Sequence, residues 1–244
     1  LEADELDLIS PLFGLDRPAN FEGRWHLHGY RTLEEVAAGQ GRSEADAAAL
    51  LGRATKKLLA ARGERVRPGR DEKVLTAWNA LMIKGMLRAG RLLGRGDLLD
   101  SADRALVFIR ERLWRDGRLL ATYKDGRAHL NAYLDDYAFL LDALLERLQT
   151  GFSAEYLDWA LALTEVLLTQ FEDAENGGFF FTSADHEALL QRPKPMADES
   201  MPSGNGVAAL SLQRLGHLLG EPRLLDAAQR ALRASADAVR RLPY

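Results

Sequence analysis

The chain has no cysteine among its 244 residues. A disulfide, a thiolate nucleophile and a cysteine-ligated metal site are therefore excluded. No apolar run approaches the roughly 20 residues that a membrane-spanning helix needs. The net charge of −4 provides no basic surplus for nucleic acid or an anionic membrane. These absences predict a soluble protein that binds neither nucleic acid nor membrane, with the cytoplasm as the default compartment.

Leucine and alanine dominate the composition and β-branched residues are few, which favours helix over strand. Residues 1–42 contain Pro11, Gly14, Pro18 and Gly23, which predict an irregular lead-in segment around one small helix. The sequence starts without methionine or a signal peptide and stops just after a helical pattern. We therefore expect a fragment of a larger protein.

A helical pattern begins at Ser43, a residue suited to capping, and is followed by three pairs of helical segments. The first segment of each pair is apolar on most sides, as in helices buried on both faces, and the second has one apolar stripe. Asp-Gly and Asn-Gly turns in the long loops between pairs predict small β-hairpins. The inner segments are 71–93, 133–148 and 203–219, and the outer ones are 97–114, 154–171 and 223–242.

This alternation predicts an all-α fold: over residues 43–244, a partial α/α toroid of about three αα-hairpins. An α-solenoid is the alternative. In either architecture the inner helices begin at the same end. The polar starts at 71–79, 133–137 and 203–205 therefore converge on one rim, where we expect any chemistry to lie.

Four motifs, "DEKVLTAWNALM", "AYLDDYAFL", "NGGFFFT" and "RPKPMADESMPSGNGVAAL", resemble in this order the thioredoxin-domain-containing family related to spermatogenesis-associated protein 20. The resemblance covers roughly residues 12–219. It implies a thioredoxin-like domain upstream of residue 1, and a toroid similar to six-hairpin glycosidases and N-acylglucosamine 2-epimerases. The chain departs from the common pattern at Ala80, where the family has Gly, and at Glu199–Ser200, often Gly-Ala. The resemblance implies no particular reaction.

Four carboxylates are candidate catalytic groups: Asp135, Asp136, Asp198 and Glu199. Glycoside hydrolysis needs a carboxylic acid and a carboxylate on either side of the scissile bond. Adjacent helical residues point about 100° apart, so we expect one member of the 135–136 pair to face the cavity with a distant acid such as Asp71, Asp198 or Glu199. The alternative is that the pair only stabilises the N-terminus of its helix.

Aromatic side chains at the rim are candidates for stacking on a sugar ring: Trp78, Tyr133 and Tyr137. The alternative is that they belong to the core, and Phe179–Phe181 fit packing of a hairpin. Asn79 needs hydrogen-bond partners, because a buried unsatisfied amide costs about 1–3 kcal/mol. A ligand hydroxyl and the backbone of a loop are both candidate partners.

The loop before the last inner segment supplies further candidates for substrate binding. Arg192 and Lys194 are suited to a carboxylate or phosphate of a substrate, and Ser203 and Asn205 stand at the start of the helix, with Asp71 at the same rim. The alternative is an internally hydrogen-bonded loop in which Ser203 caps the helix.

Histidines do not form a recognisable site in this sequence. The pair in "WHLH", His26 and His28, lacks a third ligand, so we predict neither a metal nor a cofactor. An epimerase on the toroid pattern would use histidines as acid and base, but His129, His186 and His217 stand outside the rim motifs. This favours hydrolysis or sugar binding over epimerisation.

Two hypotheses follow. The toroid binds a saccharide and hydrolyses or isomerises it, or it is a non-catalytic scaffold that binds protein or peptide for the attached thioredoxin-like domain. The scaffold hypothesis predicts no acid-lined pocket with a strongly perturbed Asp135 or Asp136. We also expect self-association through the open edges of the toroid, where apolar surface would be exposed.

Overall fold

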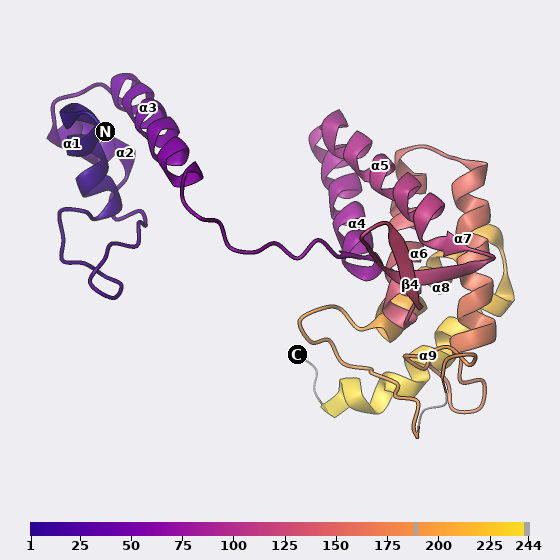
Figure 1. Cartoon of the computed structure of the whole chain (residues 1–244). Coiled ribbons are helices and arrows are strands. Elements are labelled where there is room, and N and C mark those ends of the chain that lie inside the picture. The colour runs from indigo at the N-terminus through magenta and orange to yellow at the C-terminus, as the bar shows by residue number, and fades with distance from the viewer. Residues whose placement is uncertain (188–189, 242–244) are drawn as a thin grey trace. The chain divides into compact units, whose positions relative to one another are not determined.

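The computed structural model describes residues 1–187 and 190–241. The chain divides into two compact units, Leu1–Asp71 and Glu72–Tyr244 (Figure 1). Each unit has a hydrophobic core of its own. Of the helices in the described ranges, none is both long and apolar enough to cross a membrane.

The first unit consists of α1 (Ala3–Phe13), α2 (Leu33–Gly39) and α3 (Glu44–Gly63). The predicted cap of α3 is confirmed, because the Ser43 side chain accepts a hydrogen bond from the Asp46 N–H. Leu8 of α1 and Val36 of α2 are buried in one cluster with Leu50 of α3.

Two predictions for this region are wrong. Residues 1–42 are not an irregular lead-in, because they contain α1 and α2. The domain boundary does not fall after residue 42 either, since α3 shares its core with α1 and α2, and the division follows Asp71. Pro11 lies inside α1. In the sequence this proline indicated an irregular segment, although Leu8, Ile9 and Leu12 have helical spacing.

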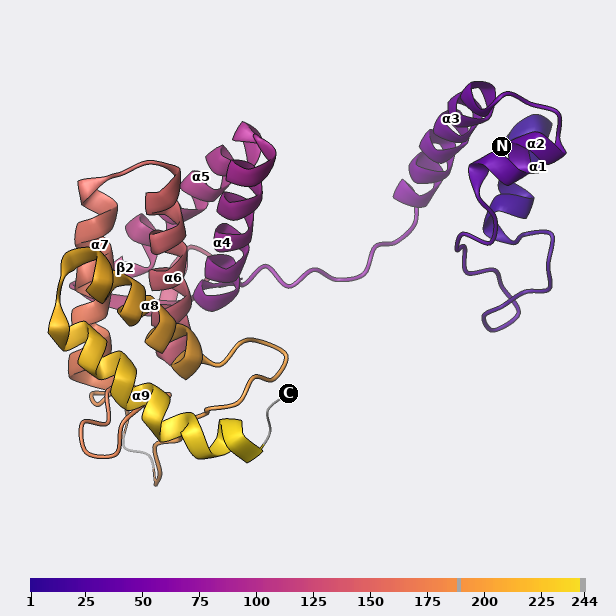
Figure 2. The same cartoon turned by 180° about the vertical axis from the view of Figure 1, so that it is seen from behind.

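The second unit is a two-layered helical array, as predicted. Its central helix α6 packs between α4 and α8, and each of these three packs against the helix that follows it (Figure 2). Every residue of α6 from Asp136 to Glu146 is buried. The predicted fold class, an all-α partial toroid of inner and outer helices, is confirmed. The helices are α4 (Thr76–Leu93), α5 (Gly96–Arg112), α6 (Leu134–Thr150), α7 (Ala154–Val166) with the π-helical turn η1 (Leu167–Phe171), α8 (Gly204–Leu219) and α9 (Pro222–Arg241).

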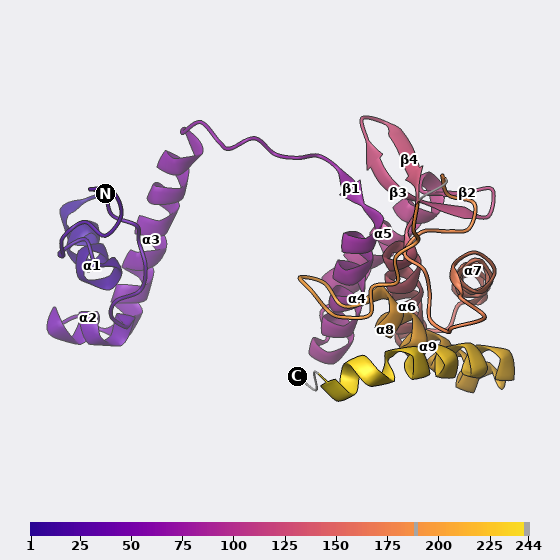
Figure 3. The same ribbon diagram turned by 90° about the horizontal axis from the view of Figure 1, so that it is seen from below.

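The first long loop forms a small antiparallel sheet against one side of the helices (Figure 3). Strand β3 (Arg118–Lys124) pairs with β1 (Val74–Leu75), β2 (Trp114–Arg115) and β4 (Arg127–Asn131). The Asp116–Gly117 and Asp125–Gly126 turns have positive φ at both residues, as tight hairpin turns require. The hairpin prediction is confirmed for this loop.

The second long loop differs from the prediction. Within its described residues it contains an isolated bridge between Glu172 and Phe179, and no strand. The Phe179 N–H and C=O both pair with the side chain of Asn205. A side chain from α8 thus takes the place of a partner strand.

Helix α4 begins later than predicted, at Thr76, because Val74 and Leu75 pair with β3. Its buried face carries Ala77, Ala80, Ile83 and Leu87. Trp78 and Met82 are instead 62% and 64% exposed, so the prediction of a helix buried on nearly all sides is wrong. The small residues Ala77 and Ala80 let the first turns of α4 approach its neighbours closely, and Trp78 and Met82 lie on the exposed face.

Candidate functional site

The starts of the three inner helices meet at one rim, as the sequence pattern predicted. One carboxylate joins two of them: Asp136 Oδ1 accepts a hydrogen bond from the Ala77 N–H of α4 at 2.8 Å, and Oδ2 accepts one from the Tyr133 N–H before α6 at 2.9 Å. The start of α8 is adjacent, because a Cβ atom added to Gly204 would overlap Asp135 Oδ1.

Asp136 is a structural residue. It is only 5% exposed, and both of its oxygens bind backbone N–H groups. Burial raises its pKa to about 7, aided by the nearby negative charge of Asp135 and opposed by the two hydrogen bonds. Its catalytic role stays a prediction, and the contacts observed here are structural. It stabilises helix starts, which was the alternative interpretation.

Asp135 has a different environment. It is partly buried, and burial raises its pKa. Its Oδ1 is buried beside Gly204 and has no hydrogen-bond partner among the described residues. Consecutive positions on α6 thus give the two acids different partners: both oxygens of Asp136 accept backbone N–H groups, whereas Asp135 Oδ1 accepts none among the described residues.

Asp135 lines two adjoining hollows, which together we call the rim groove. The larger has a volume of about 590 Å³. The smaller has a volume of about 170 Å³. Both contain Asp135, Phe181 and Met201, so they meet at these residues. The larger hollow adds a second carboxylate, Glu199, and the smaller adds Asp136 and Trp78.

Backbone hydrogen bonds between loops fix the position of residues that line the rim groove. The Leu134 N–H donates to the Phe181 carbonyl at 2.9 Å, and the Phe181 N–H donates to the Pro193 carbonyl at 2.8 Å. The rings of Tyr133 and Phe181 stack with their centroids 4.9 Å apart. These contacts fix the aromatic wall relative to the start of α6.

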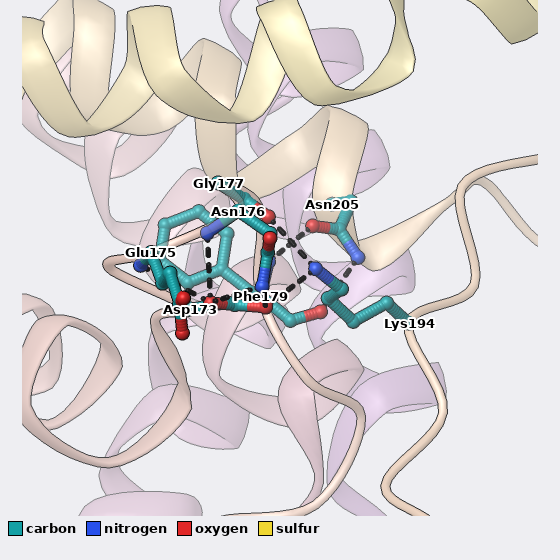
Figure 4. A network of polar contacts seen from close by, with 7 residues as sticks. All are labelled: Asp173, Glu175, Asn176, Gly177, Phe179, Lys194 and Asn205. Carbon is teal, nitrogen blue, oxygen red and sulfur yellow. Dashed lines mark hydrogen bonds and ion pairs between the residues drawn. The ribbon is translucent and has the colours of Figure 1, made fainter.

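Lys194 and Asn205 belong to an internal polar network (Figure 4). Lys194 Nζ donates to Asp173 Oδ2 at 2.7 Å and to the Gly177 carbonyl at 3.1 Å. The Asn205 amide accepts from the Phe179 N–H at 2.7 Å and donates to the Phe179 and Pro195 carbonyls, each at 2.9 Å. The network fastens the second long loop to α8.

Other candidates in this loop also have internal partners. Arg192 donates to the Gln170 and Thr182 carbonyls and lies over the Phe180 ring. Lys194 is likewise engaged, so both cations have partners inside the protein, as the alternative interpretation of an internally hydrogen-bonded loop predicted. Asp198 Oδ1 accepts the Ser203 N–H at 2.7 Å, and Ser203 caps α8.

Three remaining candidates are not among the residues that line the two hollows. Tyr137 is fully buried, and its hydroxyl accepts the Leu119 N–H at 2.8 Å, so its predicted ligand contact is wrong. The Asn79 amide donates to the Leu75 carbonyl at 2.8 Å, the backbone alternative. Asp71 is the last residue of the first unit and is not among the residues lining the two hollows.

Comparison with known proteins places this geometry in context. No family model matches the chain. Human spermatogenesis-associated protein 20 is 33% identical over 246 residues, covering 96% of this chain and 31% of that protein. This chain is homologous to spermatogenesis-associated protein 20. The rat protein is 32% identical over 223 residues, covering 87% of this chain and 28% of the relative. The chain thus spans about a third of the length of these curated relatives.

Solved structures show the fold of this chain. Cellobiose 2-epimerase from Spirochaeta thermophila matches with a TM-score of 0.55 at 18% identity, covering 67% of this chain and 43% of that one. An α-mannanase from Bacteroides thetaiotaomicron matches at 0.56 and 14%, covering 72% and 46%. An α-1,6-mannanase of Salegentibacter sp. matches at 0.55 and 14%, covering 83% and 57%. All three matches indicate that this chain has the fold of part of an α/α toroid.

The sequence did not predict some of the residues that line the rim groove. Phe181 was assigned to hairpin packing but lines both hollows, and Met201 carried no signal. His186 was placed outside the rim, yet its ring centroid is 5.8 Å from that of Tyr133. Proximity across loops is not visible in sequence spacing. Among the described residues, no group of three or more His, Cys, Asp or Glu is arranged to hold a metal ion.

Gly204, which has no Cβ atom, leaves the space that Asp135 Oδ1 occupies. A Cβ there would overlap Asp135 Oδ1 and lie 3.1 Å from Leu134 Cγ. We expect Gly204→Ala to lower the free energy of unfolding by about 1–2 kcal/mol through overpacking. Gly206→Ala is the matched control on the same helix, because an added Cβ meets only Ser203 Cβ, at 3.9 Å. Chemical denaturation measures both, and equal stability of the two variants would contradict the prediction.

Proposed function

We propose that the rim groove binds a saccharide and cleaves a glycosidic bond, with Asp135 as the general acid. The observation that carries the proposal is the state of Asp135: burial raises its pKa, Oδ1 has no partner among the described residues, and it shares a hollow with Glu199. A raised pKa keeps a carboxyl protonated closer to neutral pH, as a general acid requires.

The chemistry follows from two carboxyl groups in one groove. Asp135 donates its proton to the glycosidic oxygen as the bond from that oxygen to the anomeric carbon breaks. A water molecule adds to the anomeric carbon, and Glu199 accepts the proton that the water loses. One water is consumed and two sugar products leave. Proton exchange with solvent then restores both carboxyl groups.

The fold supports a carbohydrate substrate. The neighbours are sugar enzymes, and the Salegentibacter protein was solved as an inactive variant with two consecutive aspartates replaced by alanine, in complex with α-1,6-mannotetrose. This chain has a consecutive pair, Asp135 and Asp136, at the start of an inner helix. Here Asp136 is committed to backbone contacts, which leaves Asp135 for the reaction.

The groove also counts against a purely non-catalytic scaffold. That hypothesis predicted no acid-lined pocket with perturbed carboxyl groups. Asp135 and Glu199 line one hollow, and burial raises the pKa of Asp135.

A saccharide panel tests the proposal. We expect at least one neutral oligosaccharide to raise the melting temperature of the full chain and to release new reducing ends. A ligand at 100 times its dissociation constant stabilises the folded state by about 2.7 kcal/mol, which a thermal-shift assay detects readily. If no saccharide in a broad panel stabilises the protein or is cleaved, the proposal fails.

A further inference from the structure

The two halves of the rim groove differ in chemistry. The larger half is lined by the stiff, proline-rich loop with Gln191, Glu199 and Ser200. The smaller half contributes the aromatic side chains Trp78 and Tyr133. Asp135 lies where the halves meet. A reacting acid at the centre, with binding surface on both sides, fits a ligand that extends past the acid in both directions.

Trp78 is the strongest sign of binding surface in the smaller half. Its side chain is 62% exposed, whereas Trp159 in the core is 1% exposed. The backbone beneath Trp78 is fixed, because the neighbouring Ala77 N–H binds Asp136. An exposed indole on a fixed helix start offers a large apolar face at little cost in conformational entropy. The apolar face of a pyranose ring is complementary to such a surface.

The charge in the rim groove selects against anionic ligands. Its carboxyl side chains include Asp135, Asp136 and Glu199. Of the described residues that line the two hollows, Lys194 is the one with a cationic side chain, and it is paired with Asp173 at 2.7 Å. A uronate or a sugar phosphate would bring negative charge to this site without a free cation to meet it, which is unfavourable.

We infer that the ligand is a neutral saccharide of at least two units. One unit lies against Trp78 and Tyr133, the other occupies the larger hollow, and the bond between them lies at Asp135. This inference rests on the proposed function and adds to it the class of substrate and a specificity residue, Trp78.

Two matched variants of the exposed face of α4 test the inference. Trp78→Ala removes the aromatic face, and Met82→Ala removes an equally exposed apolar side chain that is not among the residues lining the hollows. Both are made in the full chain carrying Asp135→Asn, so that ligands are bound without turnover. Calorimetric titrations use cellotetraose, maltotetraose and α-1,6-mannotetrose, the monosaccharides glucose and mannose, and tetragalacturonate as the anionic probe.

We expect at least one neutral tetrasaccharide to bind more tightly than its monosaccharide. Trp78→Ala should weaken the tetrasaccharide about tenfold, the loss of roughly one good aromatic contact, and Met82→Ala should leave it unchanged. Unchanged melting temperatures would show that both variants fold.

Three results would overturn the inference while leaving the proposed function standing: equal affinity for mono- and tetrasaccharide, no effect of Trp78→Ala, or tighter binding of tetragalacturonate. In each case cleavage that depends on Asp135 would still be observed in the parent chain. Absence of binding by every saccharide would overturn both.

Discussion

Replacing Asp135 with asparagine is expected to slow glycoside cleavage by a factor of about 100 to 10,000, the usual contribution of general acid catalysis. Asparagine has nearly the same shape but no acidic proton to give to the leaving oxygen. Because Asp135 Oδ1 has no hydrogen-bond partner among the described residues, the fold should be little affected. The measurement is the rate of reducing-end release, with the melting temperature as the control for folding.

The pH profile gives a second readout of the same substitution. Only the protonated carboxyl can donate, so the wild-type rate should decline as the pH rises through the raised pKa of Asp135. The residual rate of Asp135→Asn should lack this alkaline limb. A variant that retains more than a third of the wild-type rate, with the limb intact, would assign the acid to another residue.

Replacing Asp136 with alanine is expected to lower the free energy of unfolding by about 2–4 kcal/mol. The substitution leaves the Ala77 and Tyr133 N–H groups without their acceptor, and each unsatisfied buried donor costs about 1–3 kcal/mol. Urea denaturation at pH 5 measures the loss. Asp136→Asn keeps one acceptor oxygen, so its stability should lie between those of the wild type and the alanine variant.

The effect of Asp136 on stability should depend on pH. In the folded chain its pKa is raised to about 7, whereas an unfolded chain releases this proton near pH 4, at about the reference value. Between these values the folded state binds more protons than the unfolded state. The contribution of Asp136 therefore makes wild-type stability fall as the pH rises from about 4 to about 7.

The comparison of wild type with Asp136→Ala isolates this effect. The alanine variant lacks the titrating group, so the difference between the two proteins should be larger at pH 5 than at pH 8. A difference that instead grows toward pH 8 would mean that the two N–H bonds outweigh burial and hold the pKa of Asp136 low.

Sequence periodicity was sufficient to predict the inner and outer helices. Buried helices with continuous apolar sequence, such as Asp136–Glu146 within α6, and turns such as Asp125–Gly126 carry strong local signals. The shared rim followed from the order of the helices alone. These features depend on neighbours in the sequence or on a repeat, which is why they could be predicted.

The details of the site depend on which polar groups find partners, and the sequence does not contain that information. Lys194 was a candidate for a substrate anion, but Asp173 lies within its reach. The sequence alone does not show which of Asp135 and Asp136 has backbone partners. In the structure, Asp136 accepts the Ala77 N–H. The exposure of Trp78 depended on small residues packing the opposite face of α4.

The bond between Ala77 and Asp136 has a consequence for the order of folding, because these residues are 59 positions apart in the chain. The chain between them contains α5 and most of the small sheet, whose own contacts shorten the span that must close before the bond can form. This hydrogen bond can form only when α4 and α6 pack against each other. The N-termini of the two helices therefore gain it in the same step of folding. The space around Asp135 is assembled at that same moment. A partly folded chain can therefore contain most of its helices and still lack the rim groove.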